Sequence, residues 1–224
     1  CQATTFCYGE KLMLKIVGSR LDNAEENDFY ETHGADAGIF FDQAKRDGIV
    51  FSKEIWEPAC GKGSISEELI ARGHKVLSSD LIDRGYGYVR DFLDETPLPS
   101  KLNCDIITNP PYKGKIDMKF VERALGLVED GCWVMMLFKT QWVSSQGRFL
   151  LFDRIGKTNY IYPYNYRISI YKSGNQGQGS NNALDYSWYC WQKGVPGKAE
   201  GRSIPHPRWA NKFPEIDILN YVNK

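Results

Sequence analysis

The chain has 224 residues, of which 42% are hydrophobic and 13% aromatic, enough for one large domain with a sizeable core. Its 28 basic and 28 acidic residues give a formal net charge of zero, which excludes a global electrostatic field that would draw the protein onto nucleic acid. No segment approaches the roughly 18 consecutive apolar residues of a membrane-spanning helix, so we expect no membrane association.

Cysteine and histidine are too scattered to predict a metal site. The cysteines form no CxxC pair and have no metal-ligand spacing, and the three histidines lie far apart in the sequence. Several cysteines lie in apolar runs, where a reduced cysteine behaves as a small hydrophobe. Residues 1–18 also lack the pattern of a secretory signal. We therefore expect a reduced, cytoplasmic protein without a metal.

The first predicted helix follows an acidic, polar stretch. Residues 20–28 read as a loop or arm, and acids outnumber bases ten to three between Asp22 and Glu57. Helical spacing begins at Ala35 and runs to Arg46. Thr32 has the side chain of an N-cap for this helix.

A short strand at Ile55 then leads into a glycine turn. Gly61 and Gly63 allow positive φ and let a ligand approach the backbone, and the N-terminus of the following helix points at the same place. The apolar positions that predict this helix are Ile65, Leu69 and Ile70. Gly-x-Gly alone is often only a tight turn. The Gly-Lys-Ser/Thr triplet of a Walker phosphate-binding loop is absent. Ser66 stands where a dinucleotide-binding fingerprint would have its third glycine.

Acidic residues end the next two predicted strands. Lys75–Asp80 ends in a carboxylate that suits a ribose diol, as in other nucleotide-binding α/β folds. Asp91 and Phe92 end a third strand with an acceptor for an adenine amine and a ring that can cover the base. A helix N-cap is the alternative role for Asp91.

The segment Thr108-Asn109-Pro110-Pro111-Tyr112 follows an apolar run that reads as a buried strand. The residue before a proline is driven out of the helical region, so Asn109 is predicted to be extended. Two prolines fix successive φ angles and remove two backbone donors. The loop therefore presents the amide oxygen of Asn109, backbone carbonyl oxygens without hydrogen-bond partners and the ring of Tyr112. These groups suit a planar ligand with an exocyclic amine, such as adenine or cytosine. A Pro-Pro turn with an incidental Asn and Tyr is the alternative.

The middle of the chain predicts a parallel sheet. A helix stopping at Gly131 precedes Cys132–Phe138, a fully apolar run expected to be a central strand. Strands that alternate with helices form parallel sheets with right-handed crossovers, and ligands bind outside the carboxyl ends of such strands. We expect one shared site, because all its candidate residues fall at such ends: Gly61, Asp80, Asp91 and Asn109.

The last third is rich in aromatic residues. Residues 160–171 alternate with period two, typical of a strand or an extended arm. Residues 172–182 read as a flexible loop, and residues 183–192 as an edge or hairpin strand. The aromatic side chains can stack bases, although ordinary sheet packing is the commoner use.

Basic residues gather near the proline-rich loop. Six basic residues stand against one acid between Lys139 and Lys172. A solvated face and a phosphate-binding rim are equally good interpretations. The second assigns five residues to nucleic acid: Lys113, Lys115, Lys139, Arg148 and Arg167.

Together these motifs resemble a known family. Glu57-Pro58-Ala59-Cys60-Gly61-Lys62-Gly63, then Asp80, Asp91-Phe92-Leu93 and Asn109-Pro110-Pro111-Tyr112, resemble the motif series of S-adenosylmethionine-dependent N6-adenine DNA methyltransferases. The small enzymes encoded by phages and prophages are the most similar. The likeness runs from about Phe29 to about Gly194.

The resemblance implies an α/β, class I (Rossmann-like) methyltransferase fold with a mostly parallel seven-stranded sheet and a C-terminal antiparallel hairpin. It implies an N-terminal arm at residues 1–28, a catalytic domain at 29–194 and a packed C-terminal tail at 195–224. It implies S-adenosylmethionine as cofactor, nucleic acid (DNA first) as partner, and the cytoplasm of a bacterial cell or phage-infected host. The oligomeric state stays open.

The family's functional residues carry over to matching positions. The implied cofactor-binding residues are Tyr30, Thr32, Glu57, Pro58, Ala59, Cys60, Gly61, Gly63, Asp80, Leu81, Asp91, Phe92 and Asn109. The implied catalytic residues are Asn109, Pro110, Pro111 and Tyr112. His33 stands where the family usually has proline, and a hydrophobic staple by Phe29 is the alternative role for the segment around Thr32.

In the implied reaction, Asn109 and the Pro110 carbonyl accept from the target amine and localise its lone pair for attack on the sulfonium methyl group. Tyr112 stacks on a flipped-out or single-stranded base. The alternatives are an RNA adenine-N6 methyltransferase, a protein glutamine N5-methyltransferase and a non-catalytic binding module. Release-factor-modifying enzymes also use Asn-Pro-Pro-Tyr, but usually with an Asp-x-Gly-x-Gly loop. Target choice is expected from short loops or a partner.

Overall fold

The computed structural model describes residues 30–94, 100–112, 115–144, 151–152, 154–168, 170–172, 184–202 and 204. Several predictions lie outside these residues: the N-terminal arm, the role of Phe29, Lys113, Arg148, most of the loop at 172–182 and most of the C-terminal tail at 195–224.

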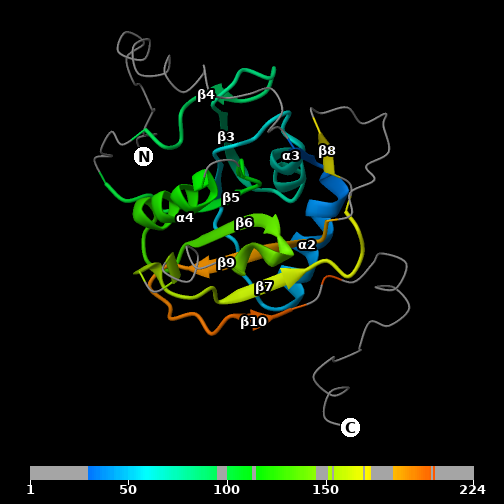
Figure 1. The fold of residues 1–224 in the computed structure, drawn as a ribbon. Helices are drawn as coiled ribbons and strands as arrows, with labels where there is room; N and C mark the ends of the chain where they lie inside the picture. Colours follow the sequence, from blue (N-terminus) through cyan, green and yellow to red (C-terminus); the bar gives the residue numbers. More distant parts are fainter. Residues whose placement is uncertain are drawn as a thin grey trace.

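The centre of the molecule is an eight-stranded sheet with the order β10-β7-β9-β6-β5-β2-β3-β4 (Figure 1). Its strands are β2 (Glu54–Glu57), β3 (Lys75–Asp80), β4 (Tyr88–Val89), β5 (Asp105–Thr108), β6 (Trp133–Lys139), β7 (Tyr160–Pro163), β9 (Tyr186–Gln192) and β10 (Glu200–Gly201). Among the described strands of this sheet, only β9 runs antiparallel to its neighbours. The predicted α/β class and mostly parallel sheet are confirmed. The predicted count of seven strands is exceeded by the short β10.

Helices cover both faces of the sheet. α2 (Gly34–Arg46) and α3 (Ser64–Ala71) share one apolar cluster with Ile55, Ile107 and Met135. α4 (Ile116–Leu127) shares the other with Trp56, Ile106 and Met136. Because successive side chains of a strand point to opposite faces, a strand covered on both sides is apolar throughout. This explains the continuous apolar run of β6, which confirms the predicted central strand.

β9 corrects one prediction. Residues 183–192 were expected to form an edge or hairpin strand. β9 pairs antiparallel with β7, which confirms the C-terminal antiparallel pair, but it lies inside the sheet between β6 and β7 and not at an edge. Its alternating aromatic residues serve the two opposite cores: Trp188 packs with α2 and α3, whereas Tyr189 and Trp191 pack on the α4 side. Aromatic alternation therefore marks an inner strand here, because bulky side chains are needed on both faces.

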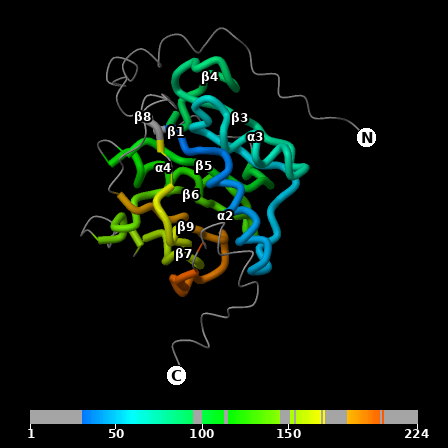
Figure 2. Tube along the Cα trace, turned by 90° about the vertical axis from the view of Figure 1, so that its right-hand side faces the viewer, coloured from blue at the N-terminus to red at the C-terminus, as the bar shows by residue number. Residues whose placement is uncertain are grey.

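The period-two segment 160–171 is not a single strand. β7 stays in the central sheet, whereas β8 (Ile170–Lys172) leaves it and pairs antiparallel with β1 (Tyr30–Thr32) (Figure 2). A periodic pattern predicts an extended chain but not its partner, so the division could not be read from the sequence. β1 and β8 form a separate two-stranded sheet.

Three predicted helix and strand boundaries are wrong. Thr32 lies in β1 and does not cap α2; the N-cap is His33, whose Nδ1 accepts from the Ala35 N–H at 3.3 Å. α4 ends at Leu127, and Gly131 instead forms the turn before β6 with φ of 93°. β4 ends at Val89, two residues before Asp91. No helix in the described part of the chain is both long enough and apolar enough to cross a membrane.

Candidate active site

The candidate residues lie where adjacent strands end. In the sheet order β5-β2-β3, β2 ends at Glu57, β3 at Asp80 and β5 at Thr108. All three strands are parallel, so their carboxyl ends meet at the same edge. The glycine turn that follows β2, Asp80, and the loop that follows β5 are thus brought together as the sequence predicts.

The glycine turn has the predicted backbone geometry. Gly61 has φ of 56°, and Gly63, the residue before α3, has φ of 89°. Both values lie in the left-handed region that favours glycine. A Cβ atom on Gly63 would overlap the ring of Tyr86, which lies directly on this turn. The close approach that Gly63 permits is therefore made by a side chain of the chain itself, and sequence reasoning did not single out Tyr86.

Asp80 is held between two turns. Its Oδ2 accepts from the Gly61 N–H at 2.9 Å, and its Oδ1 accepts from the Ile82 N–H at 3.0 Å. The Arg84 Nε lies 3.9 Å from Oδ1. The side chain keeps 14% of its surface exposed, so a diol can still reach a carboxylate whose orientation is fixed. Leu81, the next residue, is half-buried.

Asp91 and Phe92 form a turn rather than a strand end. Asp91 Oδ1 accepts from the Leu93 N–H at 2.8 Å, and no described helix begins there, so neither an N-cap nor a strand terminus is seen. The ring of Phe92 packs against Trp56 and Phe120 at centroid distances of 5.2 and 4.7 Å. With 3% of its surface exposed, Phe92 belongs to the apolar cluster on the α4 side of the sheet.

Glu57 lies beneath the glycine turn. It is 1% exposed, and the Ser66 hydroxyl donates to its carboxylate. Ser66 Oγ in turn lies 2.6 Å from Ser78 Oγ, which links α3 to β3. Burial raises the pKa of Glu57 well above its usual value, more than these hydrogen bonds lower it. In this structure Glu57 supports the turn from inside; Pro58 and Ala59 form the first part of the turn above it.

Cys60 is a packing residue. Its side chain is 5% exposed, and burial, with the nearby carboxylates of Glu57 and Asp80, raises the pKa of its thiol to about 12. A thiol with this pKa is protonated at neutral pH and is a weak nucleophile. Covalent catalysis by Cys60 is not supported.

The loop after β5 contains an oriented amide. Asn109 Nδ2 donates to Thr32 Oγ1 at 3.0 Å, and Asn109 Oδ1 accepts from the Tyr112 hydroxyl at 2.5 Å. Thr32 is 3% exposed, so it holds the nitrogen end of the amide from within the protein. The contact joins residues 77 positions apart, and spacing gave no sign of it; only the family resemblance placed Thr32 near the site.

The Tyr112 ring is turned inward. Its centroid lies 6.2 Å from that of Phe138 and 6.5 Å from that of Tyr186, and its hydroxyl is 3.1 Å from the Leu137 carbonyl oxygen. The ammonium nitrogen of Lys139 lies 6.0 Å from the ring centroid. Tyr112 was predicted to stack on the target base; in the structure it is half-buried and packs against both apolar clusters.

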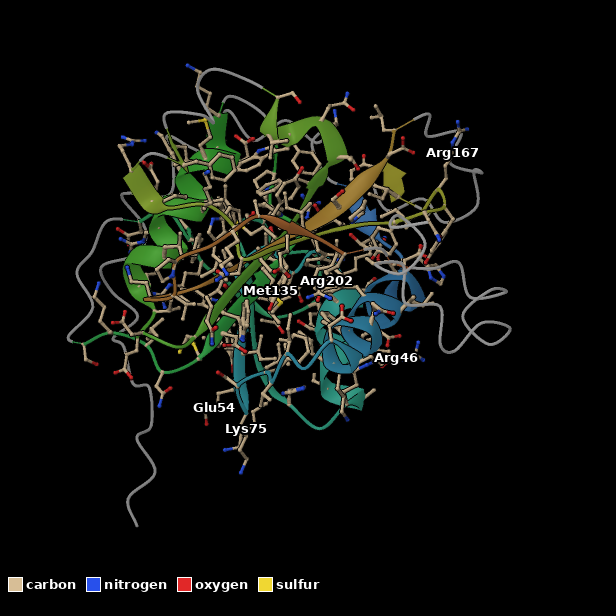
Figure 3. All side chains as sticks on the ribbon, turned by 90° about the horizontal axis from the view of Figure 1, so that it is seen from below. Arg46, Glu54, Lys75, Met135, Arg167 and Arg202 are labelled. Atoms are coloured by element: carbon tan, nitrogen blue, oxygen red, sulfur yellow. The ribbon has the colours of Figure 1, made fainter. Side chains whose placement is uncertain are left out.

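The described basic residues are not all beside this loop. Lys139 is at the end of β6 next to Tyr112, and Lys115 precedes α4 with φ of 65°. Arg167 is exposed and lies at the periphery in Figure 3, far from Met135 in the middle of the sheet. In the described part of the chain, no three His, Cys, Asp or Glu side chains are grouped so that they could hold a metal ion.

Glu31 and Ser64 complete the site and were not predicted. The Ser64 hydroxyl, at the start of α3, donates to Glu31 Oε1 at 2.8 Å. Glu31 lies in β1 next to Thr32, so β1 contacts the first residue of α3 through Glu31 and Asn109 through Thr32. An exposed-looking acid in a polar stretch carries no sequence signal for such a position.

Neither a family model nor a curated protein matches the chain. Solved structures do. A protein from Pyrococcus horikoshii named as a candidate RNA methyltransferase superposes with a TM-score of 0.56 and 15% identity, over 76% of this chain and 89% of that one. The methyltransferase subunit of a type I restriction-modification system from Streptococcus thermophilus gives a TM-score of 0.53 and 12% identity, over 75% and 45%.

A third structure, a candidate class I S-adenosylmethionine-dependent methyltransferase from Listeria monocytogenes, gives a TM-score of 0.52 and 15% identity, over 75% and 62% of the two chains. The chain has the class I methyltransferase fold. At such low identity the likeness establishes the fold alone. The chain spans 62% of the Listeria protein and 45% of the Streptococcus subunit.

Proposed function

We propose that the chain is an S-adenosylmethionine-dependent methyltransferase that methylates the exocyclic N6 amine of adenine in DNA. The observation that carries the proposal is the oriented Asn109 amide at the end of β5, held by Thr32 beside the glycine turn that follows β2. We assign the catalytic unit to residues 29–194 and a packed tail to residues 195–224.

The residues at this edge of the sheet fit the cofactor. Asp80 presents a fixed and partly exposed carboxylate to a ribose diol. Glu31 has a buried carboxylate oxygen without a hydrogen-bond partner in the described structure, next to the start of α3. A positively charged ligand with a diol would engage both. Tyr86 has to turn aside for a ligand to reach Gly63.

Asn109 supplies the chemistry toward the target base. When bound, S-adenosylmethionine supplies a methyl group on a positively charged sulfur. With its nitrogen end occupied by Thr32, the Asn109 amide directs Oδ1 to the target amine, and the Pro110 carbonyl is a second acceptor. When both N–H groups of the amine donate hydrogen bonds to these two oxygens, the nitrogen lone pair is drawn out of conjugation with the ring, which makes the amine a better nucleophile.

Tyr112 controls access to Oδ1. Its hydroxyl now donates to Asn109 Oδ1, and the Leu137 carbonyl is a second acceptor at 3.1 Å. The hydroxyl can therefore shift to Leu137 when an adenine amine arrives, without being left unpaired. The Tyr112 ring then lies beside the target base, where an aromatic face stabilises stacking.

Adenine in RNA, a glutamine amide and non-catalytic binding are the competing functions. Adenine in either nucleic acid and a glutamine amide all present an NH₂ group to Asn109. The Glu57-Pro58-Ala59-Cys60-Gly61 sequence of the turn, which resembles the DNA enzymes, favours DNA.

Mass spectrometry of nucleosides tests the proposal. DNA and RNA from cells that express the wild-type chain should show N6-methyladenine in DNA, and cells that express Asn109→Ala should not. N6-methyladenosine confined to RNA would replace the DNA assignment. If neither nucleic acid is modified, transfer of tritiated methyl groups to protein separates a glutamine methyltransferase from a binding module.

A further inference from the structure

Asp117 is a buried acid in the first turn of α4, outside the candidate active site. It is 1% exposed. Its Oδ1 accepts from the Met118 N–H at 2.9 Å, and its Oδ2 accepts from the indole N–H of Trp142 at 2.6 Å. Trp142 lies in η3 (Thr140–Val143), the 3₁₀ helix that follows β6. A buried hydrogen bond therefore ties the helix that follows the Asn109–Tyr112 loop to the segment that follows β6.

A row of aromatic rings leads from Trp142 to the candidate active site. The indole of Trp142 stacks on the ring of Phe138 with a centroid distance of 4.3 Å and an interplanar angle of 6°. The Phe138 ring lies 6.2 Å from that of Tyr112, whose hydroxyl donates to Asn109 Oδ1. Trp142 is 4% exposed and Phe138 is 0% exposed. Because a closely packed interior transmits displacements, a shift of the indole would move the ring of Tyr112.

The hydrogen bond to Asp117 fixes the orientation of this row. Contacts between stacked rings depend little on rotation in the plane of the rings, whereas a hydrogen bond is directional. Packing on Phe138 holds the indole of Trp142 in its plane. The bond to Asp117 Oδ2 sets its direction within that plane.

The junction between the loop and α4 is constrained as well. Lys115, which precedes α4, has φ of 65°. A residue other than glycine persists in this left-handed region only where the surrounding structure determines its backbone. The bond between Asp117 and Trp142 anchors the chain just after this residue. The start of the loop is anchored separately, where Asn109 Nδ2 donates to Thr32.

We propose that Asp117 is a positioning residue for methyl transfer: its hydrogen bond to Trp142 fixes the row of rings that keeps Tyr112 and Asn109 in place. This inference rests on the proposed function and deepens it, because it names a residue outside the site that sets the geometry of the catalytic amide. The loop is then held at both ends, by Thr32 at Asn109 and by Asp117 at the start of α4.

Two substitutions break this bond. Trp142→Phe keeps an aromatic ring on Phe138 and removes the N–H donor. Asp117→Asn replaces one acceptor oxygen with an NH₂ group, so one of the two N–H donors loses its acceptor. Each should lower kcat for methyl transfer to DNA about 10- to 100-fold, since a misplacement of about 1 Å costs this much, and leave the affinity for S-adenosylhomocysteine within a few-fold. The double variant should be no slower than the slower single variant, because both changes break the same bond.

Trp191→Phe is the matched control. Trp191 is 2% exposed and belongs to the same apolar cluster, and its Nε1 has no hydrogen-bond partner in the described part of the chain. The substitution therefore removes the same atoms from the same cluster without breaking a hydrogen bond. It should lower the melting temperature through the cavity that it leaves, yet keep kcat within about 2-fold of the wild type.

A second readout does not depend on activity. Hydrogen exchange of the full chain, followed by mass spectrometry, reports local opening. Trp142→Phe should speed the exchange of the peptide that contains the Asn109 and Tyr112 amides about 10-fold or more, the loss expected for one buried hydrogen bond. The peptide that contains the turn at 61–64 should change by less than about 2-fold. Trp191→Phe should change neither peptide beyond this.

The failures of the two proposals are distinguishable. If the wild type transfers methyl groups, and Trp142→Phe and Asp117→Asn keep kcat and loop exchange within about 2-fold of Trp191→Phe, Asp117 only stabilises the fold. A parallel fall of cofactor affinity would also overturn the positioning role, because the whole site would then be loosened. If the wild type transfers no methyl group, the proposed function fails, and loop exchange alone decides whether the bond holds the loop. Trp142→Phe decides the outcome if Asp117→Asn does not fold.

Discussion

Asp105 and Glu31 are both buried acids. Asp105 lies at the amino-terminal end of a central strand, and Glu31, in β1, lies near the carboxyl ends of the central strands. Asp105 begins β5 and is 0% exposed. It accepts three hydrogen bonds: from the Ser52 N–H at 2.6 Å, the Ser52 hydroxyl at 2.8 Å and the Trp133 N–H at 2.8 Å. Glu31, near the carboxyl ends of the strands, accepts one and leaves Oε2 without a described partner.

The number of hydrogen bonds that each carboxylate accepts distinguishes the two acids. At the amino-terminal edge, Asp105 ties β5 to β6 and to the segment before β2, and its hydrogen bonds offset part of the cost of burial. At the carboxyl edge, the acid is held by a single hydroxyl and can accept a ligand. The complete set of partners at Asp105 therefore marks an acid that maintains the fold, whereas the incomplete set at Glu31 leaves one carboxylate oxygen available to a ligand.

The largest effect on stability is expected at Asp105, whose carboxylate accepts three hydrogen bonds. Asp105→Ala leaves two backbone N–H groups, those of Ser52 and Trp133, without an acceptor. The free energy of unfolding should fall by about 2–5 kcal/mol, measured by urea denaturation. Asp105→Asn, which keeps one acceptor oxygen, should lose less. If Asp105→Ala instead left stability unchanged and weakened cofactor binding, the distinction between the two edges would be wrong.

A smaller effect, on affinity, is expected at the opposite edge. Asp80→Ala removes the carboxylate proposed to accept from the ribose diol, and should weaken S-adenosylmethionine by about 1–3 kcal/mol. Because Asp80 also accepts from Gly61 and Ile82, Asp80→Asn is the control that keeps an acceptor for the turn. Unchanged affinity of the alanine variant by calorimetry would remove Asp80 from the site.

The buried carboxyl of Glu57 makes the stability of the fold depend on pH. Burial raises its folded pKa above the value of 4.5 for an unperturbed glutamate. The stability that the protonated form contributes is therefore complete below pH 4.5 and is lost as pH rises through the folded pKa. Glu57→Gln removes this dependence, so the variant should gain stability relative to the wild type as pH rises above 4.5. Thermal melts with the same pH profile for both proteins would show that the carboxyl is not buried.

The smallest effect is expected from the Tyr112 hydroxyl. Tyr112→Phe frees Asn109 Oδ1 and keeps the ring against Phe138, so methyl transfer should stay within a few-fold of the wild type. Tyr112→Ala should lower both target binding and rate, because base stacking contributes about 1–3 kcal/mol. Equal losses in the two variants would assign the role to the hydroxyl instead of the ring.

Periodicity and strand ends could be predicted because they depend on neighbouring residues. β3 was predicted with its observed bounds, β6 within one residue at each end, and β2 and β5 by their positions in the chain. Apolar runs next to glycine, acid or proline mark buried strands that end in turns. The convergence of Gly61, Asp80 and Asn109 followed from parallel topology. The position of β9 inside the sheet could not be predicted, because a pattern of aromatic residues does not specify which strands lie beside it.

The contacts that build the site could not be predicted. Thr32 with Asn109, Glu31 with Ser64 and Tyr86 on Gly63 each join residues far apart in the chain. The rings of Phe92 and Tyr112 were expected to contact ligands; in the structure Phe92 is buried and Tyr112 half-buried against the apolar clusters, because burial of large apolar rings stabilises the fold.

The most direct test of the central claim is a pair of measurements on one preparation of Asn109→Ala: the affinity for S-adenosylmethionine and the rate of methyl transfer to DNA. Because Asn109 is proposed to act on the target amine, affinity should stay within a few-fold of the wild type. The rate should fall by about 10²-fold or more, as when a preorganised catalytic hydrogen-bond partner is deleted. Near-normal turnover would contradict the account, and the Asn-Pro-Pro-Tyr loop would then be only a turn.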